Sequence, residues 1–192
     1  MNKTPENTNH SDLQLIEEIV DSNKEAFKAL YEKYVRQVFS FVYKITRDSK
    51  LTEEVVNDTM FEVWKGAANF KGNSTVLTWI FGIAHNKSMN ELRKKRPEAL
   101  DPEEFSRFAS SDETAEEIVV KKDRSERMNY AMSELSPEHR TVLELTFYNG
   151  LSYQEIAEIM ECPVNTVKTR MFYAKNKLKE SLSKYGINQQ EL

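Results

Sequence analysis

The stretch that decides the fold is SYQEIAEIMECPVNTVKTRMFYA, residues 152–174. Ser152 followed three residues later by Glu155 is a capping box, which predicts the start of a short helix. A tight turn is expected at residues 161–163, and a second helix from about Val164. The positions expected to face the core are Ile156, Ala157, Met160, Val167 and Met171. This spacing predicts a helix-turn-helix, whose second helix lies in a major groove of DNA.

The outward face of the second helix carries side chains that suit a nucleic acid. Arg and Lys can pair with guanine, and Thr can contact a thymine methyl group or a phosphate. The candidate contact residues are Asn165, Thr166, Lys168, Thr169, Arg170, Phe172, Tyr173 and Lys175. The alternative is an ordinary helical hairpin with a solvated lysine face.

The turn itself has two unusual residues. Glu161 stands where helix-turn-helix motifs usually have Gly, and a left-handed backbone there costs a non-glycine residue about 1 kcal/mol. The single cysteine, Cys162, is either a small packing residue or a redox-sensitive thiol.

The composition of the chain excludes several classes of protein. The chain has 192 residues with 39% hydrophobic and 30% charged residues, which indicates a folded chain. It has no apolar run long enough for a transmembrane helix and no signal-peptide core near its start, so a cytoplasmic location without membrane insertion is expected. Its five glycines are too dispersed for a phosphate-binding loop. With three histidines and one cysteine, no metal site, cofactor or enzymatic activity is predicted.

Charge is unevenly distributed, although the net charge is −4. Residues 63–97 carry 7 basic and 1 acidic side chains, and residues 163–192 carry 6 basic and 2 acidic ones. Between them, residues 98–126 carry 4 basic and 10 acidic side chains. The two basic segments are either solvated helix faces or two separate surfaces that bind a polyanion.

Helical periodicity runs through the chain, and no segment shows the alternation of a strand. We therefore predict an all-α fold of two small helical domains. Helices are expected from Ser11, over residues 24–46, from a cap at Thr52, over 75–96, from Thr114 to about Leu135, and after Ser136-Pro137. The expected organisation is a disordered tail (1–11), a first domain (12–97), an acidic linker (98–113), a second domain (114–186) and a tail (187–192).

The helix over residues 75–96 carries a second candidate surface. Trp79, Asn86, Asn90 and Arg93 share a stripe with Gly82 and Ile83, by spacings of three and four. Aromatic and basic side chains together suit stacking on unpaired bases and contact with phosphate. The alternative places Trp79 in the core and leaves the asparagines as surface residues.

Taken together, these segments resemble the extracytoplasmic-function (ECF) sigma factors of the sigma-70 family. The similar stretches are AFKALYEKYVRQVFSFVYKI (26–45), EEVVNDTMFEVWKGAANFKGNSTVLTWIFGIAHNKSMNELRKKR (53–96) and LSPEHRTVLELTFYNGLSYQEIAEIMECPVNTVKTRMFYAKNKL (135–178). The combination of the helix-turn-helix with the loop and helix around Trp79 is specific to this family.

The resemblance implies roles for the first domain. It would bind the β′ clamp helices of core RNA polymerase through Glu53, Glu54, Asn57, Asp58 and Phe61. It would also melt the −10 promoter element and hold it as a single strand. The residues implied for that element are Asn69, Phe70, Lys71, Gly72, Asn73 and Ser74 in the loop, with Trp79, Asn86, Asn90 and Arg93 on the following helix.

The resemblance implies that the second domain reads the −35 element as duplex, through the second helix of the helix-turn-helix, and contacts the β flap. It also implies a sequestering anti-sigma factor. Two other functions remain open from the residues alone. One is a conventional two-domain regulator that binds duplex DNA without polymerase, and the other is a helical enzyme or adaptor.

Overall fold

The computed structural model describes residues 5–94 and 126–184, with side chains from residue 12 onward. All regular elements in these two ranges are helices, as the sequence predicts. The predicted acidic linker (98–113), the predicted helix start at Thr114 and the tail at 187–192 lie outside the described residues.

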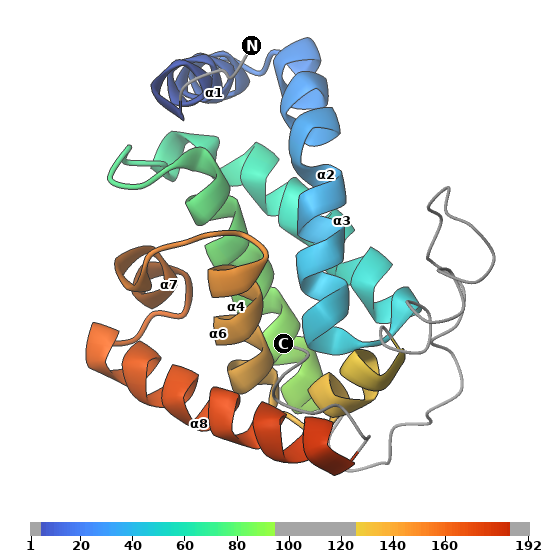
Figure 1. The fold of residues 1–192 in the computed structure, drawn as a ribbon. Coiled ribbons are helices and arrows are strands. Elements are labelled where there is room, and N and C mark those ends of the chain that lie inside the picture. Colours follow the sequence, from blue (N-terminus) through green and yellow to red (C-terminus); the bar gives the residue numbers. More distant parts are fainter. Residues whose placement is uncertain (1–4, 95–125, 185–192) are drawn as a thin grey trace, which may run out of the picture.

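Four helices form the first bundle. They are α1 (Pro5–Val20), α2 (Lys24–Thr46), α3 (Ser49–Gly66) and α4 (Val76–Lys94). A short 3₁₀ turn, η1 (Ala67–Asn69), opens the loop between α3 and α4. Figure 1 shows α2 and α3 crossing on one side of α4.

Three helices and a shorter helical segment form the second bundle. Residues 126–133 are helical and precede α6 (Pro137–Phe147). The short α7 (Tyr153–Ile159) then leads through a turn to α8 (Val164–Lys184), which runs along one edge of the molecule in Figure 1. Ser136 caps α6 by accepting from the backbone N–H of His139 at 3.3 Å, with Pro137 in the first turn as expected.

Two helix starts differ from the sequence prediction. α1 begins at Pro5 rather than at Ser11, so residues 5–11, which we expected to belong to a tail, are helical. α3 begins at Ser49, where Asp48 accepts from the N–H of Leu51 at 2.9 Å. Thr52 is therefore not the cap: its buried hydroxyl donates to the carbonyl of Asp48 at 2.8 Å and lies 2.9 Å from that of Thr46.

Packing between apolar faces holds the first bundle together. Leu30, Val38, Val42, Ile80 and Phe81 are fully buried, and the rings of Phe41 and Phe81 lie 4.6 Å apart. Asp12 of α1 is buried as well, where Lys33 and the hydroxyl of Tyr34 both donate to its carboxylate. Since a buried carboxylate needs such donors, these two bonds fix α1 on α2.

The two bundles lie directly against each other. α6 packs on α2, and α7 packs on α4. In Figure 1, α6 and α7 lie against the helices of the first bundle rather than apart from them. The helix-turn-helix of the second bundle therefore lies beside α4 of the first.

Candidate nucleic-acid interface

The helix-turn-helix has the predicted caps and turn. Ser152 begins α7 with a complete capping box: its N–H donates to the Glu155 carboxylate at 2.8 Å, and its hydroxyl accepts from the Glu155 N–H at 3.3 Å. Gly150, just before it, has a left-handed φ of 65°, which suits the expected stop after α6. Glu161 has a φ of 48°, so the left-handed residue expected in the turn is also confirmed.

The positions predicted to face the core do so. Ile156, Ala157, Met160, Val167 and Met171 are all buried. Cys162 is half-buried in the turn, and its sulfur lies 3.7 Å from a guanidinium nitrogen of Arg170. α8 is thereby held against α7 with its other face turned outward.

The outward face of α8 carries most of the predicted contact residues. Asn165, Lys168, Thr169, Phe172, Tyr173 and Lys175 are exposed, whereas Thr166 and Arg170 are half-buried. The rings of Phe172 and Tyr173 lie edge to face at 5.5 Å, and Lys175 lies 5.4 Å from the ring centroid of Phe147. The result is a surface of cations, hydroxyls and aromatic rings, which suits both phosphates and base edges.

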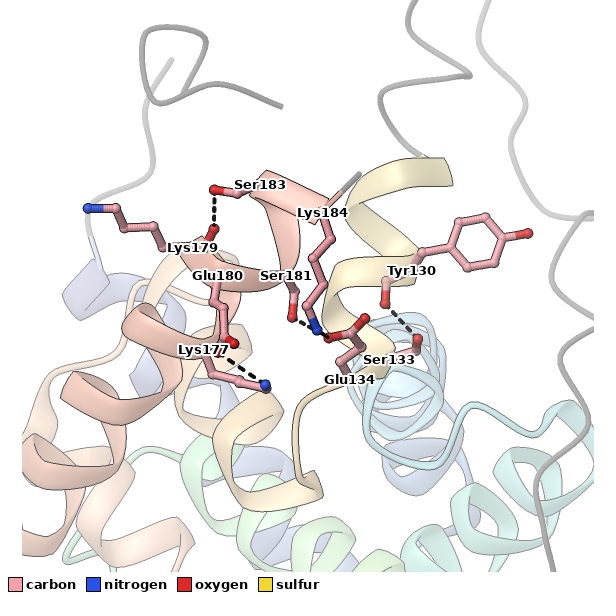
Figure 2. Close-up of polar contacts among 9 residues, drawn as sticks. All are labelled: Tyr130, Ser133, Glu134, Lys177, Lys179, Glu180, Ser181, Ser183 and Lys184. Atoms are coloured by element: carbon pink, nitrogen blue, oxygen red, sulfur yellow. Dashed lines mark hydrogen bonds and ion pairs between the residues drawn. The ribbon is translucent and has the colours of Figure 1, made fainter. Parts of the chain in front are cut away.

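The far end of α8 is anchored to the segment before α6. The Glu134 carboxylate accepts hydrogen bonds from the hydroxyl of Ser181 at 2.7 Å and from the ammonium of Lys184 at 3.1 Å (Figure 2). Lys177 pairs with Glu180 within the same helix at 3.1 Å. The two bonds to Glu134 fix the end of α8 relative to its own bundle.

The loop before α4 is exposed, as a strand-capturing loop would be. Asn69, Lys71, Gly72 and Asn73 are exposed, and Phe70 and Ser74 are half-buried. Gly72 has a φ of 70°, where a side chain would be strained. Thr75 accepts from the N–H of Thr78 at 3.1 Å and so caps α4.

Trp79 differs from the exposed position that its stripe suggests. It is half-buried, with its ring centroid 5.1 Å from that of Phe70. A Cβ added at Gly66 would lie 3.8 Å from the Trp79 ring, so the indole also lies close to the end of α3. Trp79 therefore packs against the loop through Phe70. Spacing along one helix cannot predict this contact.

The rest of the stripe faces the second bundle. The amide of Asn86 donates to the carboxylate of Glu161 at 2.6 Å. Beside it, Arg93 lies 3.4 Å from the Asn90 amide oxygen. A polar cleft of about 440 Å³ lies between the two bundles beside these residues. It is lined by His85, Asn86, Met89, Asn90, Arg93, Glu138, Met160, Glu161 and Arg170.

His85 is the buried titratable group of this cleft. It is 5% exposed, and its Nδ1 atom has no hydrogen-bond partner. Burial, which is the largest cause, and the nearby charge of Arg170 together lower the pKa of His85 to about 4. Since Arg170 belongs to α8, the pKa of His85 depends on contact between the two bundles.

A second set of contacts joins α2 to α6, and sequence reasoning missed it. Lys44 pairs with the buried carboxylate of Glu144 at 3.1 Å, and its ammonium lies 3.3 Å from the ring centroid of Tyr148. Burial raises the pKa of Glu144, and Lys44 opposes that shift. Arg140 donates to the carbonyl of Ile45 at 2.9 Å, near the end of α2. Arg47, next in the chain after α2, donates to the carbonyl of Asn129 at 2.7 Å.

The face of α3 predicted to contact a protein is fully available. Glu53, Glu54, Asn57, Asp58 and Phe61 are all exposed. Phe61 is 56% exposed and lies at the edge of a groove of about 440 Å³. That groove is lined by Lys24, Phe27, Tyr31, Asn57, Met60, Phe61 and Trp64. The groove thus lies between α2 and α3, and the exposed carboxylates belong to the same helix as Phe61.

Two features are absent from residues 5–94 and 126–184. No cluster of three or more His, Cys, Asp or Glu side chains is placed there to hold a metal ion. None of the helices in these ranges is both long enough and apolar enough to span a bilayer.

Comparisons with known proteins agree with this geometry. The family model described as Sigma-70 region 2 matches residues 30–98, and that of Sigma-70 region 4 matches residues 125–178. The RNA polymerase sigma-H factor of Pseudomonas aeruginosa is 29% identical over 184 residues, which cover 91% of this chain and 95% of that protein. The ECF RNA polymerase sigma-E factor of Salmonella typhimurium is 28% identical, with 86% and 91% covered.

A solved structure shares the fold. It is the sigma factor RpoE in complex with the anti-sigma factor NepR from Bartonella quintana, with a TM-score of 0.62 and 23% identity. The similarity covers 82% of this chain and 96% of that one. Both family models and the curated relatives set aside the conventional regulator, the enzyme and the adaptor. The chain belongs to the sigma-70 family of RNA polymerase sigma factors and is an ECF-type, non-enzymatic member with regions 2 and 4.

Proposed function

We propose that this sigma factor uses three separate surfaces to place RNA polymerase at a promoter. The face of α3 binds the β′ clamp helices, the loop and stripe of α4 hold the −10 element, and α8 reads the −35 element. The observation that carries the proposal is the outward face of α8, where cations and aromatic rings project from a helix-turn-helix whose first helix has a complete capping box.

The α3 surface supports a protein contact rather than a DNA contact. Glu53, Glu54 and Asp58 give it a negative charge that repels phosphate. Phe61 and the adjoining groove provide the apolar area that a protein interface requires at its centre. The groove also explains why Phe61 is left exposed on an otherwise polar face.

The loop and α4 support capture of a single strand. Holding an extruded base costs a few kcal/mol, and stacking and pockets have to supply it. The ring centroid of Phe70 lies 5.1 Å from that of Trp79, so an aromatic pair supports the loop of residues 69–74. Asn86, Asn90 and Arg93 then continue the surface along α4 with donors and a cation. We assign the non-template strand of the −10 element to this surface.

The exposed residues of α8 are assigned to duplex DNA at the −35 element. Lys168 and Lys175 contact phosphates or guanine, and Thr169 and Phe172 lie between them on the same face. The β flap contact is assigned to the same domain.

An anti-sigma factor is the third proposed partner. The relative RpoE is solved with its anti-sigma factor NepR. The surfaces described above give such a protein exposed apolar residues to cover, chiefly Phe61 on α3 and Phe147 at the end of α6. We expect the anti-sigma factor to compete with core polymerase for the α3 face.

The polymerase contact is tested with Phe61→Ala. Phe61 is exposed, so the change removes interface area without opening the core. Truncation of a central interface aromatic costs about 2 kcal/mol, or roughly thirtyfold in affinity. The measurement is the dissociation constant for core RNA polymerase, with labelled chain. Val20→Ala, which removes an apolar side chain that is 48% exposed on α1, is the control. Equal affinity of the two variants would refute the assignment of α3.

A further inference from the structure

Glu161 has no role in the three proposed surfaces, yet it occupies a costly position. Its φ of 48° is a conformation in which Gly is favoured and a glutamate is strained. The turn of the helix-turn-helix requires that backbone, but it does not require a carboxylate, because glycine would fit there without strain. The contact that the Glu161 side chain makes is therefore a reason for a glutamate at this position.

That contact is with the first bundle. The Glu161 carboxylate accepts from the Asn86 amide at 2.6 Å, across 75 residues of sequence. The proposed function assigns Asn86 to the −10 strand. In this structure the amide N–H of Asn86 already donates to a carboxylate oxygen, which takes the place that an acceptor on the nucleic acid would have.

The cleft around this bond is complementary in charge. α4 contributes the cation of Arg93 and the buried, neutral His85, whereas Arg170 of α8 belongs to the second bundle. The second bundle contributes two carboxylates, Glu138 of α6 and Glu161 of the turn. Acidic groups of one bundle therefore lie on the surface that the other would use for a polyanion.

Close packing beside the cleft keeps α7 on α4. A Cβ built at Gly82 would lie 3.9 Å from the Cα of Ile159, so the backbones of the two helices approach closely there. Gly82 belongs to the same stripe as Asn86 and Asn90. With α7 in this place, part of the stripe is covered by protein.

We propose that Glu161 is an intramolecular latch, which occupies Asn86 and holds the helix-turn-helix bundle over the −10-binding face of α4 in the free chain. This inference rests on the proposed function of α4. The chain has to open, with release of the Asn86–Glu161 bond, before the −10 strand can bind along the whole stripe. A closed fraction lowers the apparent affinity of free chain for single-stranded DNA in proportion to the open fraction.

The test uses Glu161→Gly in the full chain. Glycine adopts the left-handed turn without strain, so the variant keeps the helix-turn-helix and loses only the carboxylate. Glu161→Asn, which also tolerates that backbone but is shorter and neutral, separates loss of the bond from added flexibility. Glu158→Ala is the control, since it removes the same charge from an exposed position of α7.

Two readouts are measured on each variant. The first is fluorescence anisotropy with a labelled single-stranded oligonucleotide that carries the −10 element of the factor's own promoter. Because the Asn86–Glu161 bond is exposed, its loss should tighten binding by only about three- to tenfold. The second is the NMR titration of His85. Removal of the Glu161 charge by itself lowers the pKa of His85, so a rise from about 4 towards 6.5 reports that the cleft has opened and that Arg170 has moved away.

The expected result is tighter binding and a raised His85 pKa in both Glu161 variants, with neither change in Glu158→Ala. Equal tightening in Glu158→Ala would overturn the latch, because net charge would explain it. Unchanged oligonucleotide affinity and an unchanged His85 pKa in Glu161→Gly would overturn it too. If wild-type chain with core polymerase fails to start transcription at any promoter, the proposed function fails, and the His85 titration alone then decides whether Glu161 holds the bundles together.

Discussion

His85 makes the free energy of unfolding depend on pH in a defined window. It lies on α4, is 5% exposed and has an unpaired Nδ1 atom. Burial lowers its pKa from 6.5 to about 4 in the folded chain. The unfolded chain therefore binds more protons between these two values. Stability contributed by the neutral imidazole is fully present above about pH 6.5 and is lost as the pH falls towards 4.

The size of the loss follows from the pKa difference. From 6.5 to about 4, and at about 1.4 kcal/mol per pKa unit, the loss is about 3 kcal/mol. That is a large share of the stability of a small domain, which is typically about 5–15 kcal/mol. Desolvation is the largest cause and the charge of Arg170 adds to it, whereas Glu138 and Glu161 act in the opposite direction.

The assay is urea unfolding of wild type and His85→Gln from pH 7 to pH 4, followed by tryptophan fluorescence. Both tryptophans, Trp64 and Trp79, lie in the bundle that contains His85. Subtracting one curve from the other removes the titration of Glu138 and Glu144, which is common to both. The difference should change by about 3 kcal/mol across the window. Parallel curves would refute the reasoning, because they would mean that His85 is already protonated in the folded chain or solvated there.

Two further substitutions test the helix-turn-helix. Lys168→Ala should lower affinity for −35 duplex and reduce the slope of log affinity against log salt by about one, if the ammonium contacts a phosphate; an unchanged slope in a salt titration of the holoenzyme would contradict a phosphate contact. Ser152→Ala should destabilise the second bundle by about 1 kcal/mol through loss of the capping box at α7. Thermal unfolding measures that change, with the exposed Ser183→Ala as its control, and equal melting temperatures for the two variants would show that the cap contributes little.

Local signals predicted the helix-turn-helix well, because each feature depends on residues a few positions apart. Ser152 and Glu155 form the box that their spacing predicts. Glu161 takes the left-handed backbone that the turn requires. α2 runs over Lys24–Thr46, as predicted. The predicted cap of α3 was wrong, because Asp48 caps the helix. Thr52 has the residue type of a cap but lies buried in the first turn of α3.

Contacts between separate segments of the chain could not be predicted from periodicity. Nothing in the spacing along α4 indicates that Asn86 meets Glu161, or that Trp79 lies against Phe70. The pairing of Lys44 with Glu144 joins residues 100 positions apart, and each is an ordinary helix residue in its own segment. Such contacts depend on how two finished helices pack, which hydrophobic patterns predict only as buried or exposed.

Run-off transcription with bacterial core RNA polymerase, with and without this chain, tests the central claim most directly. The first template is the chain's own upstream region, followed by fragments of its genome. The account predicts discrete transcripts that require both the chain and core polymerase, and whose upstream sequences share two elements. Binding of the chain to duplex DNA without any polymerase-dependent transcript would contradict it.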